Sequence, residues 1–130
     1  MTDDPGIWII AGLQVVTALI IAGFWMTWFR IPHEEPWLPD GYEDHEAPFV
    51  VSDTALAIVL VASAILLVAE EPLGESLALI AGGMLAFLGL VDAAYFMRTG
   101  LFARERDGIA NLGLVVGVLA MAAILIVRFA

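Results

Sequence analysis

The chain contains no cysteine and no lysine among its 130 residues. Without cysteine it can form no disulfide, no thiolate metal site and no quinone-linked thiol redox centre. Its five basic residues are all arginines, and 15 acidic residues oppose them, which gives a formal net charge of −10. Because nucleic acid binding requires a basic surface, we expect no nucleic acid partner.

Motifs for catalysis and cofactor binding are missing as well. The sequence holds no nucleophile motif, no phosphate-binding loop and no cofactor fingerprint. We therefore predict no cofactor and no catalytic residues, and we favour a non-enzymatic protein over an enzyme. The first residues, Met1 to Pro5, carry acids where a secretory signal peptide carries a basic segment, so we expect no cleavable signal.

Apolar side chains are what the chain has in excess. They make up 62% of the residues, compared with roughly 45–50% in soluble domains. They gather in four segments, at residues 7–29, 50–69, 77–97 and 109–127. A helix of about 20 residues crosses a hydrocarbon core of about 30 Å. The sequence therefore predicts an all-α fold in which residues 1–130 form a single membrane domain, a bundle of four transmembrane helices.

The positive charges are distributed unevenly between the connecting loops. Four of the five arginines follow the first and third helices, namely Arg30, Arg98, Arg104 and Arg106. Because arginine-rich short loops stay in the cytoplasm, we predict a multi-pass cell membrane protein with loops 31–52 and 98–108 cytoplasmic and both termini outside. Four prolines prevent loop 31–52 from forming a continuous helix, so we expect it to cap the bundle as an acidic segment.

A polar layer is predicted where Asp92 interrupts the third apolar segment. An ionisable residue within a membrane helix is by default a functional candidate. Other polar residues fall at a similar depth, so that the expected layer consists of Asp92, Tyr95, Asn111 and Asp53. These groups could hydrogen-bond one another and thereby fix the helix register. Alternatively, they could line a cavity where Asp92 binds a cation, a protonated amine or a proton.

Small residues indicate where helices approach closely. Gly82 and Gly89 share a face with Asp92 at helical spacing, which predicts that this face packs against another helix. Gly113 and Gly117 form a Gly-x-x-x-Gly motif in the fourth segment. We expect these two glycines to pack either within the bundle or at a dimer interface.

The loop 31–52 contains enough nitrogen and oxygen donors for a divalent metal. The candidate ligands are His33, Glu34, His45 and Glu46. Their spacing matches no specific metal motif, and the prolines between them leave the ligand geometry undefined. We therefore favour a solvated acidic loop and keep zinc or manganese binding as the alternative.

These features favour a small membrane scaffold or accessory protein that binds a lipid or a small hydrophobic ligand between its helices. Membrane lipids are the expected partners, with a second copy of the chain or another membrane protein as further candidates. The alternative function is a proton- or cation-coupled carrier of small molecules that uses Asp92.

Overall fold

A computed structural model describes all 130 residues, and its regular secondary structure is entirely helical. The elements are α1 (Pro5–Trp28), α2 (Tyr42–Glu46), α3 (Phe49–Val68), α4 (Pro72–Thr99), the 3-10 helix η1 (Arg104–Arg106) and α5 (Gly108–Phe129). Four segments are long and apolar enough to cross a membrane: α1, α3 together with the preceding α2, α4, and α5. The prediction of an all-helical fold with four such segments is confirmed.

Local sequence signals explain several helix ends. The Asp4 carboxylate caps α1 by accepting a hydrogen bond of 2.8 Å from the Gly6 amide. Pro72 occupies the first position of α4, which therefore starts earlier than the predicted residue 77. Gly100 ends α4 in the left-handed region, with φ of 72°, a conformation that glycine adopts without steric cost.

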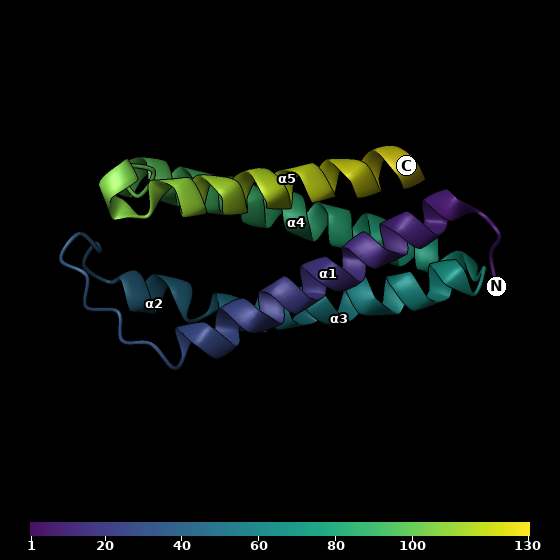
Figure 1. Ribbon diagram of the computed structural model, residues 1–130, viewed down its shortest axis with the longest axis horizontal. Helices are drawn as coiled ribbons and strands as arrows, with labels where there is room; N and C mark the ends of the chain where they lie inside the picture. The colour runs from purple at the N-terminus through teal and green to yellow at the C-terminus, as the bar shows by residue number, and fades with distance from the viewer.

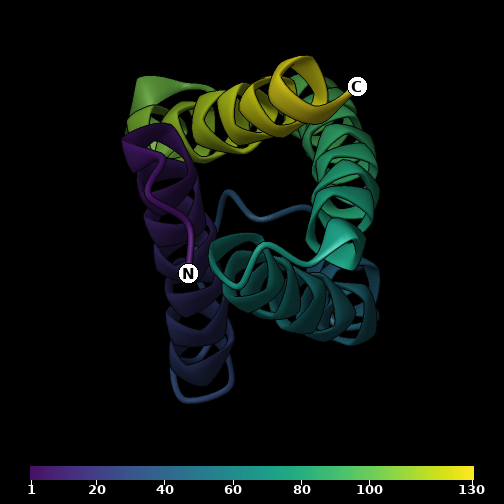
Figure 2. The same ribbon diagram turned by 90° about the vertical axis from the view of Figure 1, so that its right-hand side faces the viewer.

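The four long helices form an open row and not a closed ring. α1 packs on α3, α3 on α4, and α4 on α5, whereas α1 and α5 share no comparable interface. The start of α1 and the end of α5 lie at the same end of the bundle as both termini (Figure 1), and there Asp4 and Arg128 form an ion pair of 3.6 Å. Toward α2 the two helices diverge (Figures 1 and 2), so the bundle is a wedge that opens at the α2 end.

A continuous apolar core joins the four long helices. Its buried side chains are Ile7, Ile10, Ala18, Leu56, Leu60, Leu67, Ala78, Ala81, Leu85, Met121, Ala122 and Leu125. Two glycines of α4 let α5 approach closely. A Cβ atom at Gly82 would lie 2.9 Å from Ile126 Cγ1, and one at Gly89 would lie 2.6 Å from Leu119 Cδ2. Gly82 and Gly89 therefore lie in the α4–α5 interface, where small residues permit close packing.

A buried chain of hydrogen bonds connects α1, α3 and α4. The Gln14 amide donates to the Ser63 hydroxyl at 2.9 Å, and this hydroxyl donates to the Gly74 carbonyl at 2.8 Å. Both side chains are fully buried. Gly74 lies directly against α3, because a Cβ atom there would be 2.6 Å from the Leu67 amide nitrogen. These contacts fix the position of the first turn of α4 along α3.

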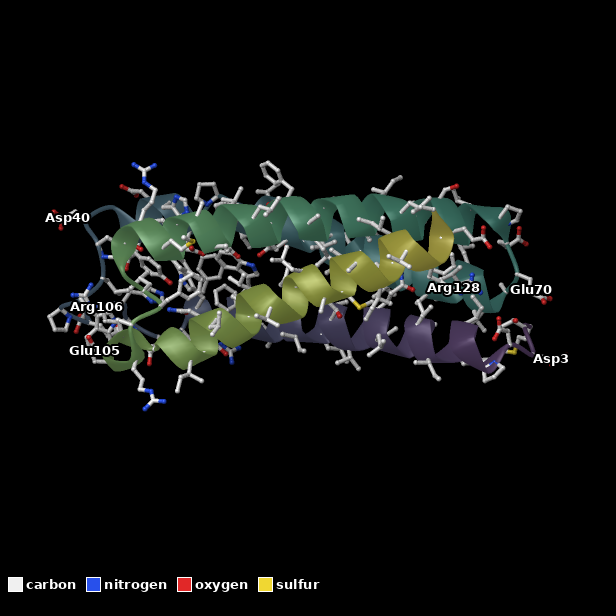
Figure 3. The ribbon with its side chains drawn as sticks, turned by 90° about the horizontal axis from the view of Figure 1, so that it is seen from above. Asp3, Asp40, Glu70, Glu105, Arg106 and Arg128 are labelled. Atoms are coloured by element: carbon white, nitrogen blue, oxygen red, sulfur yellow. The ribbon has the colours of Figure 1, made fainter.

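Apolar side chains also cover the outside of the long helices, and 27 of the 130 residues are buried. Large exposed residues occur on every long helix, among them Ile9, Leu19, Ile58, Ile65, Phe87, Leu90, Val116 and Val127. Labelled charged residues lie at the two ends of the bundle, with Asp40, Glu105 and Arg106 at one end and Asp3, Glu70 and Arg128 at the other (Figure 3). An apolar belt thus separates two charged ends.

The segment between α1 and α3 folds back over the open end of the wedge (Figure 1). Trp37 and Leu38 pack against a second apolar cluster, which Phe96, Leu101 and Val115 form at this end. The segment also contains the short helix α2. Loop residues therefore form part of the packed structure at the open end.

Candidate functional site

A cavity of about 400 Å³ occupies the open end of the wedge. Its apolar walls are formed by Ile20, Ile21, Phe24, Trp37, Leu38, Phe49, Leu85, Leu88, Phe96, Leu101, Leu114 and Val118. All four long helices and both loops at this end contribute side chains. The size and the mainly apolar lining are those of small-molecule sites, which occupy about 300–1,000 Å³.

Acidic side chains outnumber basic ones around the cavity. The acids are Glu35, Glu46, Asp53, Asp92 and Asp107, and the nitrogen-containing ionisable side chains are Arg106 and His33. None of the acids forms an ion pair, because the one salt bridge of the chain joins Asp4 and Arg128 at the closed end. Such an arrangement gives the cavity a negative potential, which attracts cations.

Asp92 faces the cavity from α4, and 8% of its surface is exposed. Its carboxyl group accepts no hydrogen bond from the protein, in contrast to Asp53, and makes no ion pair. The predicted layer is therefore not held together by hydrogen bonds to Asp92. Because the carboxyl group has no partner in the chain, it is available to a ligand.

Asp53 lines the same cavity from α3 and has a partner on α1. The Trp25 indole Nε1 donates a hydrogen bond of 2.8 Å to Asp53 Oδ2, and both residues are buried. This bond connects α1 and α3 at the level of the cavity. Sequence analysis missed Trp25, because a tryptophan in an apolar helix gives no spacing signal for its indole N–H.

Glu46 is the third buried acid of the cavity. It lies on α2 and is 8% exposed. It is close enough to Asp92 and Asp53 for the three carboxyl groups to repel one another when ionised. Sequence analysis considered Glu46 only as a metal ligand, since its position depends on how the loop folds back onto the bundle.

The four candidate metal ligands do not come together, and no group of three or more acidic or histidine side chains is arranged to hold a metal. His33 Nε2 lies 2.9 Å from the Trp28 carbonyl oxygen. The His45 ring stacks on Tyr95 with 3.8 Å between ring centroids. Glu34 is exposed, whereas Glu46 is buried at the cavity. These separate surroundings correct the hypothesis of a zinc or manganese site made by the four residues.

Neither Tyr95 nor Asn111 forms a hydrogen bond with Asp92, which was one of the two predicted arrangements of the layer. Tyr95 packs on His45 and does not line the cavity. Asn111 does line it, but its amide nitrogen donates to the Leu101 carbonyl at 2.7 Å. This hydrogen bond links the first turn of α5 to the loop that follows α4. Of the predicted layer, Asp92, Asp53 and Asn111 share the cavity.

The two glycines of the Gly-x-x-x-Gly motif do not pack against another helix of the bundle, which was one of the two expected arrangements. Gly113 and Gly117 line the cavity, and a Cβ atom at either position would meet nothing within 4 Å. Within the chain, neither glycine makes the close helix contact that the spacing predicted. The absence of side chains at these positions widens the cavity instead.

Comparison of the chain with protein-family models, with curated proteins and with solved structures found no match. The cavity and the distribution of charge around it are therefore the grounds for a functional assignment.

Proposed function

We propose that the chain is a multi-pass membrane protein whose cavity binds a small hydrophobic ligand, and that it acts as a non-enzymatic accessory or scaffold protein. The observation that carries this proposal is the cavity of about 400 Å³, with apolar and aromatic walls and buried acids that make no ion pair. The apolar belt supports a membrane location, because soluble proteins rarely expose contiguous apolar surfaces of this extent. Membrane lipids would cover the belt.

The open end of the wedge is proposed to face the cytoplasm. Four arginines lie at the open end and Arg128 lies near the closed end. Arg30 follows α1, Arg98 is in the last turn of α4, and Arg104 and Arg106 are in the loop before α5. Short loops rich in arginine are retained on the cytoplasmic side. Both termini would then lie outside.

Single cysteines introduced into this cysteine-free chain test the orientation. Asp40 and Glu75 are exposed at opposite ends of the bundle. In intact cells, a membrane-impermeant maleimide should label the Glu75→Cys variant, and it should label the Asp40→Cys variant only after the membrane is permeabilised. The reverse pattern would show the opposite orientation. Labelling of both variants in intact cells would contradict a protein that spans the membrane as proposed.

A leucine at Gly117 tests the cavity as the binding site. Gly117 lines the cavity and faces open space, so the Gly117→Leu side chain should fill the cavity without moving the backbone. We expect native mass spectrometry of protein released from membranes to show a small-molecule adduct. In the Gly117→Leu variant the fraction of protein that carries this adduct should fall at least about tenfold, because the leucine occludes a pocket that buries most of its ligand.

Gly12→Leu is the matched control for this experiment. Gly12 is exposed on α1, outside the cavity, and a Cβ atom there meets nothing within 4 Å. The adduct should remain at the level of the unaltered protein in this variant. Equal retention in the two leucine variants would show that the cavity is not the binding site.

A proton- or cation-coupled carrier is the second candidate function. The observation in its favour is that two buried acids, Asp92 and Glu46, face one cavity without an ion pair. The two functions differ in whether a proton or a cation crosses the membrane together with a small molecule. Uptake into vesicles that contain the purified protein measures this difference.

A further inference from the structure

We propose that the cavity binds an amphiphilic organic cation, that is, a protonated or quaternary amine attached to an apolar body. This inference rests on the proposed function, because it specifies the chemical class of the ligand in the same cavity. Three observations support it: two buried carboxyl groups without partners, an excess of acids around the cavity that do not form a metal site, and its aromatic walls.

Asp92 and Glu46 have neither an ion-pair partner nor a hydrogen-bond partner within the chain. Each is 8% exposed, lines the cavity and makes no ion pair. Buried carboxyl groups in proteins are normally paired or hydrogen-bonded, because transfer out of water is costly for the charge. A cation in the cavity would pair with both groups.

None of the other ionisable groups at the cavity forms an ion pair with Asp92 or Glu46. Asp53 accepts the Trp25 indole N–H. The Arg106 guanidinium lies 3.5 Å from the Thr99 carbonyl oxygen and makes no salt bridge with the cavity acids. Glu35 and Asp107 add further negative charge, and His33 lies against the Trp28 carbonyl. The balance of charge around Asp92 and Glu46 therefore remains negative.

A divalent metal ion does not suit this arrangement. Calcium and magnesium need six to eight oxygen ligands at about 2.0–2.6 Å. The acids of the cavity lie on α2, α3, α4 and the adjoining loops, and no three of them converge to hold a metal. Carboxyl groups that line one cavity of about 400 Å³ without forming a metal site fit a cation with a body of its own.

The aromatic walls provide the surface for that body. Phe24, Trp37, Tyr42, Phe49 and Phe96 line the cavity together with the acids. Aromatic faces attract ammonium groups through the ring quadrupole, and they also cover apolar surface. A neutral hydrophobic molecule would gain the second interaction only, and it would leave Asp92 and Glu46 without a partner.

A pair of probes with the same shape separates charge from hydrophobicity. Benzyltrimethylammonium is the cationic probe, and neopentylbenzene is its neutral isostere, with carbon in place of nitrogen. Binding of each to the full chain in lipid nanodiscs is measured by equilibrium dialysis, with empty nanodiscs to subtract partitioning into lipid. We expect the cation to bind at least about tenfold more tightly than the isostere, which is the effect of a desolvated charge pair.

Isosteric variants then identify the counter-ions. Asp92→Asn and Glu46→Gln should each weaken binding of the cation about tenfold or more and leave the neutral probe unaffected. Asp3→Asn and Glu75→Gln remove the same charges from exposed positions at the closed end and should change neither affinity. If Asp92→Asn fails to fold, the affinities of the two probes for the unaltered protein and for Glu46→Gln still test whether the cavity prefers the cation.

Two outcomes would overturn the inference while leaving the proposed function intact. Equal affinities for the two probes, both abolished by Gly117→Leu, would show a cavity that binds hydrophobic molecules without regard to charge. Displacement of the cationic probe by micromolar calcium or manganese would show an inorganic cation site. If neither probe binds, or if Gly117→Leu changes no affinity, the proposed function fails together with the inference.

Discussion

Replacing Gly74 with alanine should lower the free energy of unfolding by about 3 kcal/mol, the upper part of the range for an overpacked contact. A Cβ atom at Gly74 would lie 2.6 Å from the Leu67 amide nitrogen and 2.9 Å from the Leu66 carbonyl carbon. Both are backbone atoms of α3, so no side-chain rotation relieves the clash. A shift of the backbone would also lengthen the hydrogen bond from Ser63 to the Gly74 carbonyl.

Gly12→Ala is the matched control for this prediction. Gly12 lies within α1, and an added Cβ atom meets nothing within 4 Å. Alanine there should raise stability by about 0.5–1 kcal/mol, because glycine is the poorer residue in a helix interior. Unfolding of both variants in the same detergent, followed by circular dichroism, should give shifts of opposite sign. A Gly74→Ala variant as stable as Gly12→Ala would contradict the close approach of α3 and α4.

Replacing Trp25 with phenylalanine should lower the free energy of unfolding by about 2 kcal/mol, the cost of leaving a buried acceptor without its donor. Phenylalanine keeps an aromatic ring at this position but removes the indole N–H that donates to Asp53. Trp28 offers a matched control, since its buried indole nitrogen forms no hydrogen bond of good geometry and does not contact Asp53 through one. We expect Trp28→Phe to be close to neutral in the same unfolding assay.

A double-mutant cycle with Asp53→Ala isolates the energy of the bond. Once Trp25 has become phenylalanine, removing the Asp53 carboxyl group should cost less than it does in the unaltered protein, because the two changes eliminate the same interaction. Additive effects would show that the hydrogen bond contributes nothing to stability.

The helical architecture was predictable because it depends on local properties of the chain. Apolar segments of sufficient length identified the four long helices, and the predicted bounds lie close to the observed ends except at the start of α4, which begins at Pro72. Helical periodicity also placed Asp92 on the face that carries Gly82 and Gly89. In the structure this face turns inward, with Asp92 at the cavity and the glycines against α5.

The rest of the site depends on contacts that periodicity does not encode. Glu46 and Trp37 reach the cavity because the segment between α1 and α3 folds back, and prolines remove any regular period from that segment. His45 was a candidate metal ligand by residue type, yet it stacks on Tyr95 of α4. For Gly113 and Gly117, the motif marks a surface without side chains but does not determine what lies opposite it.

Both termini lie at the closed end of the wedge (Figure 1), and the residues that line the cavity lie at the other end. An affinity tag or a fluorescent protein fused to either terminus would therefore be separated from the cavity by the closed part of the bundle. The protein can be immobilised on a sensor surface through either terminus, with the cavity exposed to solution.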